Sequence, residues 1–334
     1  MNFYYPAVIF LSTLLVFTFS SCKDTGYRFY EGFAEGTTFH ISYQSDSNYN
    51  EQISQLLGQF EKSLSTFDSG SIISRINRND TTVIPDEYFI KFFKKSSEIA
   101  EATDGAFDIT VAPLVNAWGF GFSEMGTVSD SLIDSLLQFV GMDKVSLVND
   151  RIRKKDTRVM LDGSAIAKGF SVDIIGDFLS AKGIKNFMVE IGGEVVARGK
   201  NMEGKLWRIG IDKPVDDPYA INRELQAIVE LKDKAVATSG NYRRFRIENG
   251  IKLSHTINPK TGYPAGNELL SVTIMAEDCI TADAWATACM VTGLEKSIRT
   301  IENNPGLNAF FIYSDEQGQS RIFMTEGLKK SIIE

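Results

Sequence analysis

The stretch between Phe187 and Met275 constrains the fold more than any other part of the chain. Strand-like runs follow one another there, and no helical pattern separates them. Parallel neighbours would need long crossover connections, usually helices, whereas antiparallel neighbours need only short turns. The sequence therefore predicts an α+β fold with a largely antiparallel sheet rather than a doubly wound one. The predicted strands are 187–191, 207–211, 227–231, 242–248, 252–256 and 270–275, and Asn249-Gly250 predicts a hairpin turn.

Helical patterns and further strands flank this block. Apolar residues recur at helical spacing in 51–66, 88–103, 131–140, 165–182, 282–292 and 294–303. Strand-like runs cover 39–43, 144–148, 158–161, 309–313 and 321–324. No long linker or internal repeat separates these elements, and a hydrophobic content of 43% is enough for a sizeable core. We therefore expect residues 22–334 to form a single domain.

Composition excludes several functional classes. Lysine and arginine total 35 against 43 acidic residues, so the net charge of −8 argues against a broad surface for nucleic acid. The two histidines, His40 and His255, lack HExxH spacing, which excludes a zinc hydrolase of that type. Three cysteines are too few for a disulfide framework, and we expect Cys279 and Cys289 to be unbridged thiols.

The first 21 residues predict an export signal. They contain no charged side chain, and the apolar run from Ala7 to Phe19 is shorter than a membrane-spanning helix requires. The small pair Ser20-Ser21 then precedes Cys22, as in a lipobox, where the cysteine is lipidated and becomes the new N-terminus. We therefore expect a signal peptide at 1–21 and a lipid-anchored protein on the periplasmic side of a bacterial envelope membrane. Ordinary secretion and a retained membrane anchor are the alternatives.

The run from Asp162 to Gly169 suits phosphate, because a predicted strand ends there in small residues and a helix begins. Gly163 permits close approach of a ligand, and the helix N-terminus offers N–H groups. Lys168 adds a positive charge in the first turn. The structural alternative makes Asp162 or Ser164 a helix cap and leaves Lys168 solvated, and the run taken alone favours it.

Asp283 and Thr287 lie four residues apart on the predicted helix that Thr281 caps, so their oxygens project from one side. Magnesium suits such a pair, because it takes one or two carboxylates and keeps its other positions for water or substrate phosphate. In the structural alternative, Asp283 complements the helix dipole and Thr287 bonds back to a carbonyl. That alternative is typical of an isolated pair.

Further candidates are a histidine and two aromatic residues. His255 ends a predicted strand just before a Pro/Gly-rich turn, where a general base can be held, although a lone histidine is usually structural. Phe67 and Phe107 could stack on a heteroaromatic ligand beside Asp108, and core packing would equally explain both rings.

Taken together and in order, these runs resemble the ApbE family, the FAD:protein FMN transferases. The resemblance covers nearly all of the chain after Cys22. Two positions depart from the family pattern: Glu35 stands where Met is usual, and Phe67 where Tyr is frequent. The matching runs are 36–39, 65–67 with 71–77, 105–108, 162–169 with Asp173, 190–194, 239–244, 255–264 and 281–288.

The resemblance implies a T-fold-like, mixed architecture of largely antiparallel sheets and packed helices, with FAD in a cleft between two lobes. It implies magnesium-dependent transfer of FMN from FAD to a threonine hydroxyl of an acceptor protein, with release of AMP. Family acceptors are exported subunits of ion-pumping and related redox complexes. Carried over position by position, it implies FAD contacts from Phe67, Ala106, Phe107, Asp108, Asp162, Lys168 and Ile257, magnesium ligands at the Ala165 carbonyl, Asp283 and Thr287, and His255 as the catalytic base.

Two other functions fit the same residues less well. A magnesium-dependent FAD pyrophosphatase would pass the phosphorus to water, which needs only room beside the metal. Stacking of Phe67 on the ligand would exclude some water and favour transfer. A non-catalytic FAD-binding lipoprotein would need neither the metal ligands nor His255. Glu35 would repel FAD phosphates if it faced them, so we expect it to point away from the site.

Overall fold

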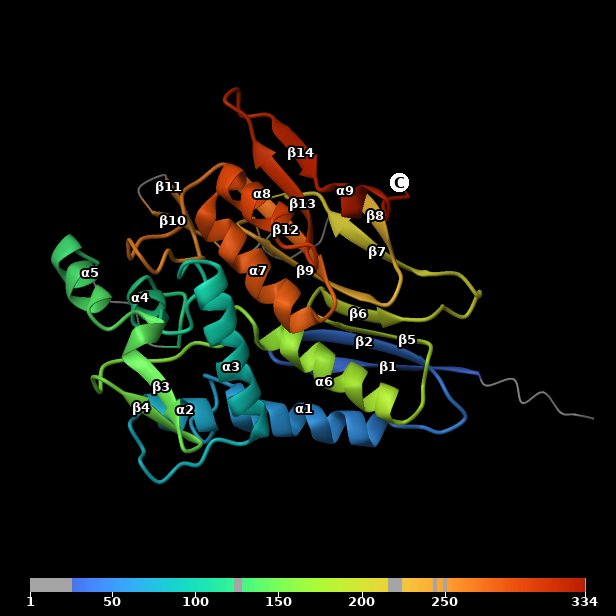
Figure 1. Ribbon diagram of the computed structural model, residues 1–334, viewed down its shortest axis with the longest axis horizontal. Helices are drawn as coiled ribbons and strands as arrows, with labels where there is room; N and C mark the ends of the chain where they lie inside the picture. Colours follow the sequence, from blue (N-terminus) through green and yellow to red (C-terminus); the bar gives the residue numbers. More distant parts are fainter. Residues whose placement is uncertain (1–25, 123–127, 216–223, 243–244, 249–250, 334) are drawn as a thin grey trace, which may run out of the picture.

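The computed structural model describes residues 26–122, 128–215, 224–242, 245–248 and 251–333. Its centre is an eight-stranded sheet in which every neighbouring pair is antiparallel, in the order β1-β2-β5-β6-β9-β12-β13-β14 (Figure 1). The predicted α+β class is therefore confirmed. The strands are β1 Tyr27–Ala34, β2 Thr37–Gln44, β5 Phe187–Ile191, β6 Glu194–Arg198, β9 Lys234–Gly240, β12 Leu269–Ala276, β13 Asn308–Ser314 and β14 Ser320–Met324.

Helices cover one face of this sheet. α6 (Ala167–Ala181) packs on β5 and β6, and α7 (Cys279–Thr292) packs on β9 and β12. α1 (Asn50–Leu64) packs on α6, and α3 (Glu87–Ala102) packs on α7 (Figure 1). The remaining helices are α2 Ile72–Asn77, α4 Ala112–Ala117, α5 Asp130–Leu137, α8 Leu294–Glu302 and α9 Glu326–Lys329, with a 3-10 turn at Met142–Lys144.

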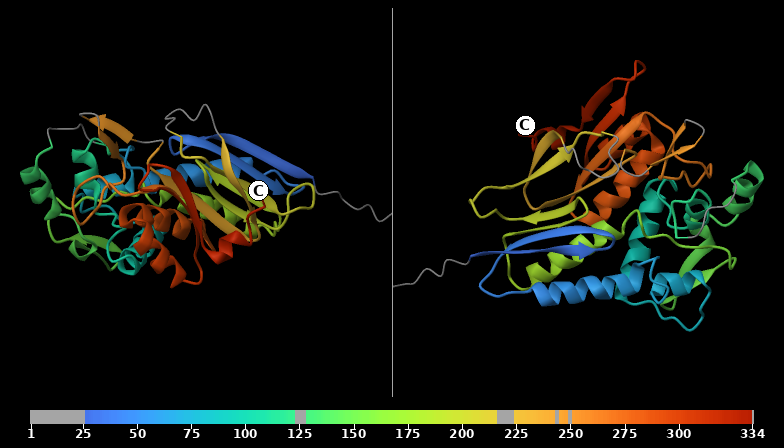
Figure 2. Two further views of the ribbon diagram at one scale, coloured as in Figure 1. Left: turned by 90° about the horizontal axis from the view of Figure 1, so that it is seen from above. Right: turned by 180° about the vertical axis from the view of Figure 1, so that it is seen from behind.

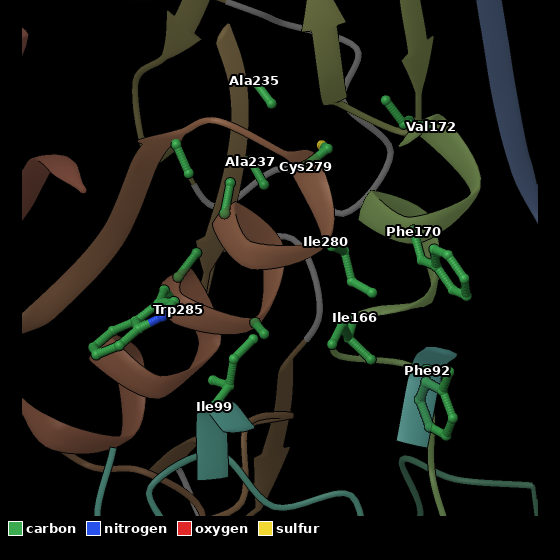
Figure 3. Close-up of a cluster of buried hydrophobic side chains, with 14 of the residues drawn as sticks. Phe92, Ile99, Ile166, Phe170, Val172, Ala235, Ala237, Cys279, Ile280 and Trp285 are labelled. Carbon is green, nitrogen blue, oxygen red and sulfur yellow. The ribbon is translucent and has the colours of Figure 1, made fainter. Parts of the chain in front are cut away.

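The main core lies between the sheet and these helices. Figure 3 shows Phe170 and Ile166 from the α6 region beside Ile280 of α7 and Phe92 of α3. α7 is buried on most of its circumference, and its alanines let it lie close to both α6 and the sheet. A side chain that changes the spacing between α6 and α7 would therefore disturb the interior directly.

Three two-stranded sheets complete the fold. β7 (Trp207–Asp212) and β8 (Leu225–Leu231) cover part of the other face of the main sheet and form a second core with β6, β9 and β13 (Figure 2). β3 (Val145–Val148) pairs with β4 (Arg151–Lys154). β10 (Phe245–Glu248) pairs with β11 (Ile251–Ser254), with Glu248 opposite Ile251. The predicted turn residues Asn249-Gly250 lie outside the described residues, as do the expected signal peptide and Cys22.

Two local predictions are wrong. The apolar run 158–161 is not a strand: the Asn77 side chain donates to the Leu161 carbonyl at 2.8 Å and accepts from its N–H at 2.7 Å. One amide side chain thus satisfies both backbone groups of Leu161, and the run's backbone pairing includes an isolated parallel bridge between Met160 and Val111. Thr281 does not cap α7, because Asp278 does so by accepting from the Thr281 N–H at 3.0 Å.

The thiol prediction is confirmed, since Cys279 and Cys289 are both free and buried in α7. Strands β1, β4, β6 and β9 were not predicted from the sequence. No helix within the described ranges is both long and apolar enough to cross a membrane.

Candidate functional site

One pocket of about 360 Å³ collects most of the predicted site residues. It lies where the N-terminal end of α6 meets α7, and its wall also includes the 106–111 segment, the 192–194 turn, the ends of β7 and β9 and the loop after β11. Phe67 does not line it: this side chain is 74% exposed on the loop after α1. The predicted residues that do line the pocket are Ala106, Phe107, Asp108, Asp162, Ala165, Lys168, His255, Ile257, Asp283 and Thr287.

A close approach of α6 and α7 places the acid of the pocket. The Gly169 N–H donates to Asp283 Oδ2 at 3.0 Å. A Cβ atom at Gly169 would lie 2.3 Å from the Cys279 carbonyl oxygen and 2.7 Å from Asp283 Cβ. Only glycine allows this spacing, so residue 169 fixes where Asp283 stands against the first turn of α6.

A second carboxylate holds the same two helices together from within. Asp173 of α6 accepts hydrogen bonds from the backbone N–H groups of Cys279 and Ile280, both at 2.8 Å. These N–H groups belong to the first turn of α7, where a helix has unpaired donors. Burial raises the pKa of Asp173 to about 7, although the two N–H groups favour the ionised form.

The turn before α6 is organised by Asp162. Its Oδ1 accepts from the Ser164 N–H at 2.8 Å and from the Ser164 hydroxyl at 2.6 Å. Asp162 therefore stabilises this turn and not the first residue of α6, whose N-cap Ile166 makes no side-chain cap hydrogen bond. Gly163 does not line the pocket, and a Cβ atom there would meet the Phe92 ring at 3.4 Å, so the expected approach of a ligand to Gly163 is not supported.

Lys168 is not solvated as the structural alternative proposed. Its Nζ lies 2.5 Å from Glu194 Oε1, and only 4% of the Glu194 side chain is exposed. Burial disfavours the Lys168 charge, but the carboxylates of Glu194 and Asp283 outweigh it and raise the pKa of the lysine. Burial also raises the pKa of Glu194, to about 7, against the opposing effect of Lys168. The Lys168 side chain itself is 30% exposed, so the pocket holds a partly buried cation paired with a buried carboxylate.

Glu35, which we expected to point away, lies close to this cation without lining the pocket. Its Oε1 is buried and has no hydrogen-bond partner among the described residues. Its backbone is in the left-handed region (φ 52°), and its N–H donates to Glu61 Oε1 at 3.1 Å. Burial raises the pKa of Glu35 to about 7, while the positive charge of Lys168 lowers it.

The donors expected for a metal meet in the pocket. Asp283 is 3% exposed, and Thr287 lies one turn further along α7, 3.1 Å from the Ser239 hydroxyl of β9. Ala165 lines the same pocket from the other side. One carboxylate, one hydroxyl and one carbonyl are hard oxygen donors that fit magnesium. The described residues contain no cluster of three or more His, Cys, Asp or Glu that would suit a softer or more charged site.

Asp108 is a buried acid with a structural set of partners. Its Oδ1 accepts from the Thr110 N–H at 2.7 Å and hydroxyl at 2.6 Å, and its Oδ2 accepts from the Met142 N–H at 3.1 Å. Burial raises its pKa despite these bonds. Because these N–H and O–H donors already occupy the carboxyl oxygens, Asp108 fixes the shape of this wall of the pocket.

His255 enters the pocket from a braced loop. Its ring centroid lies 6.4 Å from that of Phe120, in an edge-to-face arrangement. The following residues pair back on themselves, with Ile257 bridged to Pro264 and the Asn258 N–H donating to the Tyr263 carbonyl at 2.9 Å. This rigid turn holds the imidazole in a fixed place, as acid–base chemistry requires.

Sequence reasoning missed Glu194 and Ser239 as site residues. Both lie in runs that carried the family resemblance, but neither had an assigned role. The signal that could have found Glu194 is its position after Gly192-Gly193, two glycines with positive φ (63° and 103°) that both line the pocket. A turn of two glycines with positive φ reverses the chain direction, so the next side chain, Glu194, faces the pocket.

Comparison with known proteins gives consistent matches. The model of the ApbE family matches residues 36–311, which include every residue that lines the pocket. The FAD:protein FMN transferase of Haemophilus influenzae is 34% identical and covers 92% of this chain and 93% of its own length. That of Vibrio cholerae is 36% identical over 80% of this chain and 82% of its own. The structure of the flavin transferase ApbE from Vibrio cholerae superposes with a TM-score of 0.81 at 32% identity, covering 92% of this chain and 99% of that one.

Proposed function

Because the chain belongs to the ApbE family and is an FAD:protein FMN transferase, we propose that the pocket at the meeting of α6 and α7 transfers FMN from FAD to a threonine hydroxyl of the acceptor protein, with magnesium bound and with release of AMP. The observation that supports this most directly is the convergence of Lys168, Asp283 and His255 on one pocket. A passive carrier of flavin would need only the first of these.

Binding of the FAD diphosphate falls to Lys168 and the start of α6. The diphosphate carries about two negative charges, and a partly buried ammonium attracts them more strongly than a fully solvated one. The N-terminus of the 15-residue helix α6, which has no side-chain cap, adds a favourable dipole. Ala106, Phe107 and Ile257 would contact the rest of FAD, and Asp108 and Asp162 would shape the walls. Phe67 would contact the part of FAD that extends beyond the pocket.

Asp283, Thr287 and the Ala165 carbonyl would hold the magnesium ion. When bound, magnesium neutralises diphosphate charge and stabilises the departing AMP. The Gly169 N–H holds Asp283 by one oxygen, so the carboxylate is oriented before any ligand arrives.

His255 is our candidate for the base. The threonine oxygen attacks the FMN phosphorus, the bond from that phosphorus to the AMP oxygen breaks, and the hydroxyl proton passes to the imidazole. The product is an FMN phosphoester on the acceptor. We propose that the acceptor is an exported subunit of an ion-pumping or related redox complex.

The test is to incubate the purified protein with FAD, magnesium and a threonine-bearing acceptor peptide, and to measure peptide-bound FMN by mass spectrometry and AMP by chromatography. Asp283→Asn should reduce both products at least about a hundredfold, because the variant lacks the negative charge that holds the cation. Asp143→Asn is the matched control, since Asp143 is a surface residue paired with Lys155.

Three results would contradict this proposal in different ways. AMP and free FMN without peptide labelling would indicate an FAD pyrophosphatase. Bound FAD without AMP would indicate a carrier. Unchanged magnesium dependence in Asp283→Asn, with full activity, would show that Asp283 is structural.

We also propose that the protein is exported and anchored to an envelope membrane through a lipid on Cys22. The support is the sequence, where an apolar segment ends in Ser20-Ser21-Cys22. Cys22→Ala should abolish incorporation of a labelled fatty acid, because the thiol is the attachment point. Label retained on this variant would overturn the anchor.

A further inference from the structure

The end of β2 and β5 opposite the pocket is formed by four chain segments: 26–28, 44–46, 182–186 and 199–205. We call this set of residues the tether tip. Backbone and side-chain hydrogen bonds join the segments: Ser45 N–H to the Gly26 carbonyl at 3.2 Å, and Lys200 N–H to Asn186 Oδ1 at 2.9 Å. Tyr27 also donates its hydroxyl to the Lys200 carbonyl. The loops after α6 and β6 and the start of β1 accordingly lie at the same end of the molecule (Figure 1).

The tether tip has the opposite charge balance to the whole chain. Five cations belong to it, Arg28, Lys182, Lys185, Lys200 and Lys205, and the four lysines are exposed. The four segments contain two acids, Asp46 and Glu203, and beside them Asp233 accepts from the Gly199 N–H at 2.8 Å. The whole chain, in contrast, carries a net charge of −8. A local excess of cations on an acidic protein selects an anionic partner.

An exposed apolar side chain accompanies these cations. Met202, at the turn between β6 and β7, is 69% exposed. An apolar side chain among lysines is the composition of surfaces that rest on lipid headgroups, where the apolar group inserts and the ammonium groups stay at the phosphates.

A lipid on Cys22 would bring this end of the molecule to the membrane. If Cys22 carries the lipid, as proposed above, only residues 23–26 separate it from the start of β1. An extended chain spans at most about 3.6 Å per residue, so Tyr27 lies within about 18 Å of the lipidated cysteine. Lys200, whose carbonyl accepts from the Tyr27 hydroxyl, and the loops beside it are then held near the headgroups.

We propose that the tether tip is a docking surface for an anionic phospholipid bilayer. It fixes the orientation of the protein, because the pocket lies at the other end of β2 and β5. The Gly192 N–H donates to the Thr38 carbonyl at 3.0 Å at that far end, and β2 has eight residues. At about 3.3 Å per residue, the pocket stands roughly 25 Å from the tip. The acceptor threonine is therefore presented at about that height above the bilayer.

The experiment uses the mature chain from residue 22 with Cys22→Ser, so that binding is measured without the lipid. Co-sedimentation is compared with vesicles of phosphatidylcholine alone and with vesicles in which about one third is phosphatidylglycerol. We expect binding only to the second kind, with loss at high salt. Replacing Lys185, Lys200 and Lys205 together by Gln should weaken it about a hundredfold, from about fivefold per lysine. The matched control replaces Lys94, Lys155 and Lys296, exposed lysines outside the tip, and should change binding less than threefold.

Equal binding to both vesicles, or equal loss in the two triple variants, would overturn the docking surface. Loss of FMN transfer to a soluble acceptor in the tip variant would also overturn it, and would assign the lysines to an acidic protein partner instead. The vesicle assay does not depend on the lipid anchor, because the Cys22→Ser protein carries no lipid. Fatty-acid labelling of Cys22 tests the anchor separately. Full transfer to the soluble acceptor by the tip variant is the expected result.

Discussion

The pocket and the tether tip both rely on lysine, and they use it in opposite environments. Lys168 lies against Glu194, a carboxylate whose side chain is 4% exposed, and α7 adds Asp283 close by. Lys200 and Lys185 lie on exposed loops. An interaction between charges is several times stronger where water is excluded. We therefore expect single substitutions at the pocket to reduce FMN transfer strongly. Single substitutions at the tip should each weaken membrane binding only slightly, and their effects should add.

The two regions also differ in how their charged side chains are held in place. At the pocket each charged group is fixed by a backbone or side-chain partner, as Gly169 fixes Asp283. At the tip the four lysines are exposed, and the Lys205–Glu203 pair at 2.9 Å lies on the surface. A catalytic site needs the first arrangement, whereas a headgroup layer tolerates the second.

The largest effect should come from His255→Ala. Loss of a general base typically costs about 10²–10⁴-fold in rate, and FAD affinity should be unchanged because the base acts on the acceptor hydroxyl. Single-turnover transfer and FAD titration measure the two quantities. His40→Ala is the matched control: its ring is exposed and bonds Glu190 at 2.7 Å, outside the pocket. Full transfer by a folded His255→Ala protein would remove histidine from the mechanism.

Gly169→Ala should destabilise the fold by about 3 kcal/mol, since the new methyl group meets the Cys279 carbonyl and Asp283 inside a packed interface. Urea denaturation measures this change in the free energy of unfolding. Gly58→Ala in α1 is the control, because its Cβ meets no atom within 4 Å and alanine favours a helix by about 0.5–1 kcal/mol. Equal stability changes in the two variants would mean that the α6–α7 spacing is not fixed by residue 169.

Glu35→Gln should change the pH dependence of stability. The folded protein holds the Glu35 proton up to about pH 7, whereas the unfolded chain releases it near 4.5. This contribution to stability is therefore full below pH 4.5 and lost as the pH rises to about 7. Between pH 5 and pH 8 the wild type should therefore lose about 2 kcal/mol more of its free energy of unfolding than the Gln variant does. Glu31→Gln, on the exposed face of β1, should leave the pH profile parallel to that of the wild type.

The smallest pocket effect should come from Thr287→Val. The variant keeps the shape of α7 and the Asp283 carboxylate but loses one neutral oxygen donor, so we expect about a tenfold higher magnesium requirement. A magnesium titration of AMP release measures it. Ser239→Ala removes the hydroxyl partner of Thr287 and should change the requirement less. A loss as large as that of Asp283→Asn would show that the hydroxyl and the carboxylate act as one unit.

Much of the fold was predictable because local pattern and tertiary environment agree. The helical periodicity of 165–182 and 282–292 placed α6 and α7 to within three residues at each end. Consecutive strands after Phe187 correctly predicted antiparallel pairing, although only β5 and β12 of the six lie in the main sheet, while β7–β8 and β10–β11 form separate pairs. The pocket residues followed from the family resemblance and not from spacing, because each motif taken alone favoured a structural interpretation.

The remaining features depend on contacts between distant residues. Nothing near Leu161 shows that Asn77 will satisfy its backbone groups, and nothing near Glu194 shows that it will meet Lys168. Glu35 could be identified as unusual but not placed, because its burial depends on the packing of α1 and α6 around it. Such long-range pairings carry no local pattern that a sequence can display.

The hydrogen bond between Gly169 and Asp283 spans 114 residues of chain. Closing a loop of this length costs conformational entropy, and the contact can form only after the chain has been synthesised through α7. Nascent or truncated chains that lack α7 therefore have no site for FAD, however well β1, β2, α1 and α6 have formed. FAD binding in this protein therefore requires the completed fold. FAD with magnesium should slow proteolysis of the full chain and leave fragments that lack α7 unprotected.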